Sequence, residues 1–169
     1  MSTFVQRLER ERRHLLDGPA PDEKPAGVGT VRFIAQCAGD SWRVLARAKA
    51  VLREVDQAAI GGWPTHAAWS GILPDWFVAA CAPEQTREEA EEELRSWRLL
   101  APEDQAEVQR HEPWSLSAWV YWFHADNRTW FWWDAAEEDA NTILVAVEVD
   151  EWPFPWGSLS WLLRAAGAS

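Results

Sequence analysis

The sequence predicts an α+β fold in which N-terminal helices pack on a C-terminal antiparallel sheet. The sheet is expected to have three strands or more, to be rich in tryptophan and to be closed by a short C-terminal helix. Apolar side chains recur at helical spacing through much of the N-terminal part, and the spacing changes to two after residue 115. The 14 tryptophans, most of them in the C-terminal half, require a fold that accommodates large rigid rings. A chain of 169 residues fits one domain.

The chain is expected to begin with a helix and a linker. A capping-box pattern at Thr3 starts a helix over residues 3–16. Residues 17–29 are rich in proline, glycine and charged side chains, which is typical of a linker. We therefore divide the chain into 1–29, an N-terminal helix with its linker, and 30–169, a single α+β domain.

The middle of the chain is predicted to hold one strand followed by helices. The strand is expected at 30–37. Helices are then predicted over 42–59, 75–81, 84–100 and about 102–111. The third of these helices is the most clearly defined, because Thr86 and Glu89 form a second capping box and apolar residues follow at helical spacing. Its run of glutamates is interpreted as a solvated helix face.

The C-terminal region is predicted to be a three-stranded meander with a closing helix. The strands are placed at 117–124, 129–134 and 142–149. Asp126-Asn127 is the predicted hairpin turn between the first two, because both residues tolerate positive φ. The polar segment 135–141 leads to the third strand, and the closing helix spans 158–166.

The predicted strands carry aromatic rings on both faces of the sheet. In the third strand, one alternating set of side chains is apolar throughout, whereas the other set becomes polar at Glu148 and Asp150. This pattern predicts one core face and one mixed face. We expect Trp119, Tyr121 and Trp132 to lie near these two carboxylates on the mixed face.

Two interpretations of the aromatic residues remain open. If helices cover both faces of the sheet, the tryptophans are core residues, and each indole N–H needs an acceptor. Alternatively, they form an exposed aromatic-acidic surface of the kind found at interface hot spots. The segment 152–156, held extended by two prolines, is either a staple over the sheet edge or the lip of a binding site. The candidate surface residues are Trp119, Tyr121, Trp132, Asp134, Glu148, Asp150, Trp152 and Trp156.

Charge restricts the class of partner. The chain has 27 acidic and 16 basic residues, a net charge of −11, which repels phosphate backbones and anionic membranes. Direct nucleic-acid or membrane binding is therefore not expected, whereas a basic protein or a cationic ligand is favoured. No apolar run is long enough to span a bilayer, and residues 1–16 lack the apolar core of a signal peptide, so we expect a cytoplasmic location.

Catalytic and metal-binding motifs are not evident. The four histidines lack a zinc-ligand spacing, and the two cysteines are expected to be buried free thiols. We therefore predict no cofactor and no metal. One catalytic hypothesis remains, in which Asp134, Glu148 and Asp150 line an aromatic cleft, as the paired acids of glycoside hydrolases do.

These observations favour a non-enzymatic acidic protein that binds a basic protein partner through an aromatic-acidic surface. A small bacterial antitoxin or immunity-type inhibitor would have this profile. The alternative is a small-ligand-binding domain or hydrolase with a Trp-lined acidic pocket for a sugar or a cation. A third hypothesis is that the tryptophans serve only the core.

Overall fold

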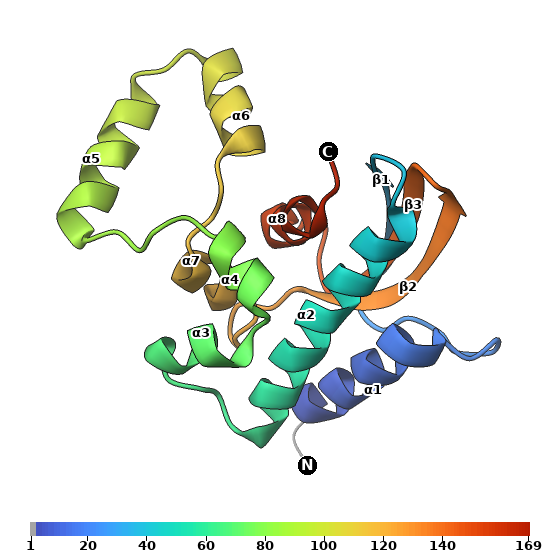
Figure 1. The fold of residues 1–169 in the computed structure, drawn as a ribbon. Helices are drawn as coiled ribbons and strands as arrows, with labels where there is room; N and C mark the ends of the chain where they lie inside the picture. Colours follow the sequence, from blue (N-terminus) through green and yellow to red (C-terminus); the bar gives the residue numbers. More distant parts are fainter. Residues whose placement is uncertain (1–2) are drawn as a thin grey trace.

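The fold is built on a three-stranded antiparallel sheet with strand order β1-β3-β2 (Figure 1). The computed structural model describes residues 3–169. Within them the strands are β1 (Gly29–Gln36), β2 (Trp130–Asp139) and β3 (Thr142–Val149). Strands β2 and β3 form a hairpin, and β1 pairs with the other side of β3, so β3 is the central strand.

Eight α-helices surround the sheet within the described residues, which confirms the predicted α+β class. They are α1 (Thr3–Asp17), α2 (Ser41–Gly61), α3 (Trp69–Ile72), α4 (Asp75–Ala80), α5 (Arg87–Arg98), α6 (Pro102–His111), α7 (Leu116–Tyr121) and α8 (Gly157–Ala166), with a 3-10 turn at His66–Ala68. No helix in residues 3–169 combines the length and the apolar character that crossing a membrane requires.

The predicted strand 117–124 is wrong, because most of this segment forms helix α7. The Ser115 hydroxyl caps the helix by accepting a hydrogen bond from the Ala118 N–H at 3.3 Å. The buried residues Leu116, Trp119 and Val120 then follow helical spacing, and the aromatic run Tyr121-Trp122-Phe123 directly after them resembles a strand in composition. The third strand of the sheet is instead β1, close to the predicted 30–37.

The predicted hairpin is wrong in position as well. Asp126-Asn127 lies in the turn between α7 and β2, and the hairpin turn joining two paired strands is at Ala140-Asn141. The segment 135–141, predicted as a connection, mostly continues β2 to Asp139. Its polar side chains are compatible with a strand because β2 is an edge strand exposed to water at that end.

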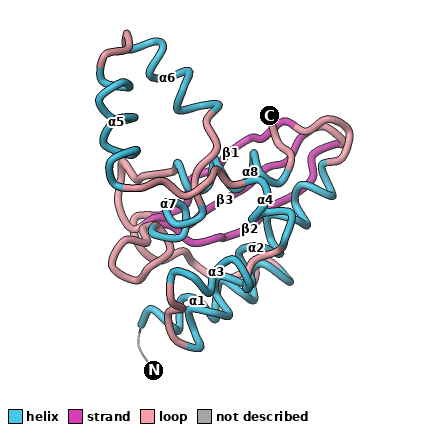
Figure 2. The backbone as a smooth tube through the Cα atoms, turned by 60° about the vertical axis from the view of Figure 1, so that its left-hand side comes forward, coloured by secondary structure: helices cyan, strands magenta, loops and turns pink. Residues whose placement is uncertain are grey.

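The main core lies between one face of the sheet and helices α2 and α8 (Figure 2). The apolar face predicted for the third strand is confirmed, since Ile143, Val145, Val147 and Val149 are at most 2% exposed. Ser158, at the start of α8, accepts two indole hydrogen bonds: its hydroxyl from Trp130 and its carbonyl from Trp119, both at 2.9 Å. These contacts satisfy the N–H groups of two buried tryptophans.

Helix α1 packs against α2 and β2, and it buries Leu8 and Leu15. It also covers the outer edge of β2, which is the side of Trp132 that does not pair with β3. The Trp132 N–H donates to Glu11 Oε1 at 2.5 Å, and the Trp132 carbonyl lies 3.4 Å from His14 Nδ1. The division of the chain at residue 29 stays a prediction.

A buried arginine connects these elements. The side chain of Arg128, between α7 and β2, is completely buried. Its guanidinium donates to Asp56 Oδ1 on α2 at 3.0 Å, to Glu11 Oε2 on α1 at 2.5 Å and to the Trp130 carbonyl at 3.1 Å. The rings of Phe131 and Phe123 lie 4.5 and 5.0 Å from it. Arg128 thus joins two helices and a strand through charge, hydrogen bonds and aromatic contacts.

Arg128→Met is expected to lower the free energy of unfolding by about 3–5 kcal/mol, because it leaves two buried carboxyl groups without their cation. Urea unfolding followed by circular dichroism measures this loss. Arg53→Met, at an exposed position on α2, is the control and is expected to change the free energy by less than about 0.5 kcal/mol. A loss below about 1 kcal/mol in Arg128→Met would contradict the role given to this cluster.

The same cluster contributes to the dependence of stability on pH. Burial raises the pKa of Glu11 well above its ordinary value of 4.5, and burial also raises the pKa of Asp56, while the Arg128 charge opposes both shifts. An acid with a raised pKa binds its proton more tightly in the folded protein. Its contribution to stability is therefore complete below the unfolded pKa and is lost as pH rises through the folded pKa.

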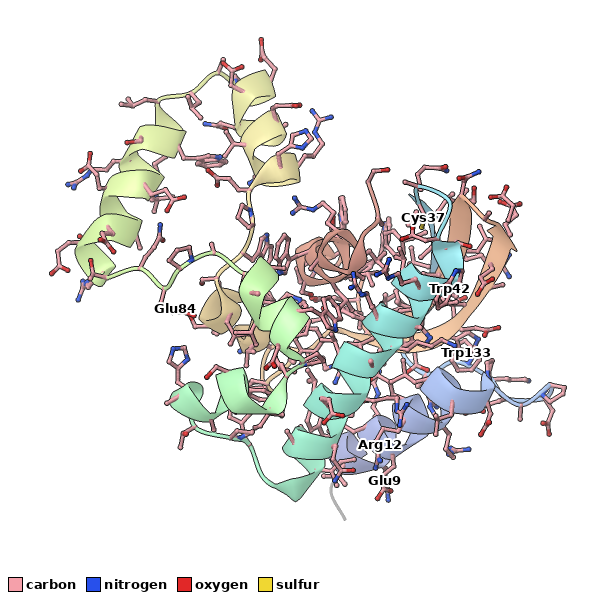
Figure 3. The ribbon with its side chains drawn as sticks, in the orientation of Figure 1. Glu9, Arg12, Cys37, Trp42, Glu84 and Trp133 are labelled. Atoms are coloured by element: carbon pink, nitrogen blue, oxygen red, sulfur yellow. The ribbon has the colours of Figure 1, made fainter. Side chains whose placement is uncertain are left out.

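Glu11→Gln removes this titration, so the variant's free energy of unfolding is expected to fall less than that of the wild type as pH rises above 4.5. The measurement is a series of urea unfolding curves at increasing pH. Glu9→Gln, on the exposed side of the same helix (Figure 3), controls for the change of net charge. Equal pH slopes in the wild type and Glu11→Gln would be inconsistent with a raised pKa at Glu11.

Candidate functional site

The structure separates the residues predicted to form one surface. Trp119 and Trp132 are core residues, 0% and 1% exposed, so they are not available to a partner in this fold. Trp132 lies opposite Val147 on the core face of the sheet, not beside Glu148. Tyr121 is 55% exposed at the end of α7, where its ring packs edge-on against Trp122.

Glu148 and Asp150 are occupied by arginines of α1. The buried Glu148 carboxylate accepts a hydrogen bond from Arg7 at 2.8 Å, a second from Arg10 and a third from the Ala26 N–H at 2.8 Å. Asp150 accepts one from Arg7 at 2.7 Å. These carboxylates hold α1 and the segment before β1 against the sheet. Asp134, the third acid of the predicted hydrolytic group, is exposed on β2 and has no arginine partner among the described contacts.

Residues 84–112 form a separate feature, which we call the acidic arm. They contain α5 and α6 and project from the body of the molecule (Figures 1 and 2). The arm has ten acidic residues and four arginines, so it carries a charge of −6, more than half of the chain's −11. Such a concentration of one sign of charge produces a local field that attracts cations.

The arm is anchored where it leaves and rejoins the body. The Ala82 N–H donates to the Trp114 carbonyl at 2.9 Å, and the two chain segments form an isolated parallel β-bridge there. Glu84, labelled in Figure 3, accepts a hydrogen bond from the Ser117 N–H at 2.9 Å and another from the Ser117 hydroxyl. The arm therefore begins and ends at a fixed place beside α7.

Local contacts define the two helices of the arm. The predicted capping box is present at the start of α5, with Thr86 and Glu89 exchanging hydrogen bonds of 2.8 and 3.2 Å. Between the helices, the Gln105 side-chain amide donates to the carbonyls of Trp97 and Leu100 at 3.1 and 3.2 Å. Pro102 starts α6, where its missing N–H costs nothing.

The inner side of the arm is apolar. A groove of about 540 Å³ lies between α5 and α6, and its apolar lining consists of Ala90, Leu94, Trp97, Leu100 and Val108. Carboxylates of Glu93 and Glu112 are also part of its wall. Although the arm lies wholly within the described residues, neither of its helices buries a side chain, and Leu94 is 45% exposed.

A second cleft, of about 640 Å³, lies between α6, the start of α8 and the segment before it. Its walls include the rings of Trp114, Phe154 and Trp156, with Arg110 and Arg164 as the cations. Gln109 and Glu112 line both hollows, so the groove and the cleft adjoin along α6. Trp156, one of the predicted surface residues, thus lines this cleft.

Trp114 defines the shape of this cleft through its contact with Gly157. A Cβ atom on Gly157 would lie 2.8 Å from the Trp114 ring, so only glycine allows this approach. Trp152 is 69% exposed, and its ring lies 6.1 Å from that of Phe154 outside the cleft wall. Of the two exposed tryptophans predicted in this segment, one lines the cleft and the other does not.

The sequence interpretation missed the arm as a candidate site. From the sequence, the glutamate run is interpreted as a solvated helix face, and the apolar residues Ala90, Leu94 and Trp97 serve only to define the helix. The helical spacing of these apolar residues is visible in the sequence. Whether another element covers them depends on the path of the whole chain, which the sequence pattern does not show. Within residues 3–169, no group of three or more His, Cys, Asp or Glu side chains could hold a metal ion.

Comparison with known proteins does not add a functional assignment to this geometry. Function must therefore be inferred from the residues and their arrangement. No protein-family model matches the sequence, and no curated protein or solved structure shows significant similarity to it.

Proposed function

We propose that the protein is a non-enzymatic binding protein that holds a basic protein partner on its acidic arm. The observation that carries this proposal is the combination of a −6 charge with uncovered apolar side chains on one projecting segment. Carboxylates would attract the partner and set its orientation, and apolar contacts such as Trp97 would supply most of the binding energy. Like the surface expected from the sequence, the arm is aromatic and acidic, but different residues form it.

The proposal extends to an inhibitor of the antitoxin or immunity type, which neutralises a basic nuclease or toxin. Long-range attraction accelerates the association of oppositely charged proteins, which matters for an inhibitor that must capture its target quickly. An acidic arm that projects from the body can reach into a basic active-site cleft. The occupied state of Glu148 and Asp150 argues against the alternative of a hydrolase based on these acids.

The cleft beside Trp156 supports a second candidate, a small-ligand site. Its volume is in the range of known ligand pockets, and two indole rings and two arginines face it. A sugar ring would stack on Trp114 or Trp156 and form hydrogen bonds with Glu112 and the arginines. A cationic ligand has less support, because the arginines repel it.

Partner capture at two salt concentrations tests the first proposal. Immobilised wild-type protein should retain a basic protein from its native lysate at about 0.1 M salt and release it at about 1 M, where charges are screened. The variant Glu88→Gln/Glu93→Gln/Glu112→Gln should lose this partner. The control Glu54→Gln/Glu137→Gln/Glu138→Gln changes the net charge equally at exposed positions outside the arm and should keep it. A partner that both variants retain would overturn the assignment to the arm.

Tryptophan fluorescence tests the second candidate. Titration with a panel of simple sugars should shift the emission of the wild type and leave that of Trp156→Ala unchanged, because stacking on this ring is lost. Trp152→Ala, an exposed tryptophan outside the cleft, should respond like the wild type. A flat response of the wild type across the panel, or an equal response in Trp156→Ala, would exclude the cleft as a sugar site.

A further inference from the structure

The two helices of the arm lack the packing that normally stabilises helices of their length. Helix α5 has 12 residues and α6 has 10, and isolated helices shorter than about 12–15 residues are marginal in water. In globular proteins, burial of an amphipathic face supplies the missing stability. Helix α5 has such a face in Ala90, Leu94 and Trp97, α6 contributes Val108 beside it, and the body of the protein buries none of these side chains.

The uncovered faces of α5 and α6 meet in one groove. Leu94 and Trp97 on α5 lie on the same side of the helix, and Val108 on α6 lines the opposite wall. A groove whose two walls carry apolar side chains of two helices can be covered by a third helix, which contacts both walls at once. Glu93 and Glu112 also line this groove, and the neutral side-chain amide of Gln85 donates a hydrogen bond to the Glu93 carboxylate.

We propose that the groove between α5 and α6 binds an amphipathic helix of the basic partner. The apolar face of that helix covers Leu94, Trp97 and Val108, and its lysine or arginine side chains pair with Glu93 and Glu112. This inference rests on the proposed function and specifies the element of the partner that the arm recognises. The adjoining cleft at Trp114 and Trp156 extends the surface along α6 for residues beyond the end of the bound helix.

Two other occupants of the groove are excluded, one by its charge and the other by its existing contacts. A second copy of this chain would bring its own arm, with a charge of −6, against an equal charge. The arginine-rich helix α1 of the same chain is already committed, because Arg7 and Arg10 pair with Glu148 and α1 packs on α2 and β2. The arm's charge thus favours a cationic helix from another protein.

A designed peptide provides a defined probe. We suggest a labelled peptide of about 15 residues, long enough to fill the groove, with leucine and lysine placed so that all leucines share one helical face. One control has the same composition with leucine and lysine alternating, which favours a strand. A second control replaces every leucine by serine and keeps the lysines. Binding to the full-length protein is measured by fluorescence anisotropy.

The helical peptide is expected to bind at least tenfold more tightly than either control. Leu94→Ser should weaken its binding about tenfold, whereas Leu99→Ser, 88% exposed and outside the groove, should not change it. Glu93→Gln/Glu112→Gln should weaken binding about fivefold and reduce its salt dependence. The control Glu137→Gln/Glu138→Gln carries the same change of net charge on β2 and should bind as the wild type does. Circular dichroism of each variant verifies that it retains the helix content of the wild type.

The outcomes separate this inference from the proposed function. Equal binding of all three peptides would mean that charge alone recruits the partner, which overturns the helix-in-groove inference and leaves the acidic arm as the binding surface. If the helical peptide does not bind although the arm-dependent partner is captured, the inference is likewise overturned. Failure of both experiments would reject the proposed function together with the inference.

Discussion

The structure depends above all on the burial of one guanidinium group. Arg128 is completely enclosed, and it contacts carboxylates from α1 and α2 together with a carbonyl of β2. A buried charge is tolerated only when it is paired and hydrogen-bonded, so each of these elements must be in place before the others are stable. Glu11 adds a second constraint, because its other oxygen accepts the Trp132 N–H at the edge of the sheet. One cluster thus fixes the two helices relative to strand β2, which carries the buried rings of Trp130, Phe131 and Trp132.

This constraint also explains why α1 belongs to the folded body despite the proline-rich segment that follows it. Glu11 and His14 cover the backbone of Trp132, so the helix protects an edge that would otherwise invite pairing with another chain. Arg7 and Arg10 form ion pairs with Glu148 of strand β3, which pairs with β2. The Arg7 guanidinium lies 3.7 Å from the Phe131 ring. Arg7 and Arg10 are therefore engaged within the chain, although their side chains are 21% and 23% exposed.

Sequence reasoning succeeded where local signals agree and failed where distant contacts decide. Helix α5 and strand β3 were predicted because a capping box and a run of β-branched residues between polar segments each point to one structure. The segment 117–124 was misassigned because half of its residues are aromatic, and rings at positions 119, 121, 122 and 123 fit both a strand and a helix. Arg128 lies in a short polar turn, and its partners are 72 and 117 residues away, so no local pattern reveals its role. The candidate site was missed for a related reason. Whether another element covers the Leu94 stripe depends on how distant parts of the chain fold around it.

The closure of the arm at Ala82 and Trp114 has an evolutionary consequence. Because the chain leaves and returns at adjacent points, the 29 residues from Glu84 through Glu112 can vary without displacing the segments that flank them. The arm contributes no buried side chain, whereas the sheet and its tryptophans are buried with α2 and α8. Substitutions in the arm are therefore expected to change its surface while the body retains its stability. Related chains that recognise different targets would be expected to diverge fastest in these 29 residues and slowest around Arg128.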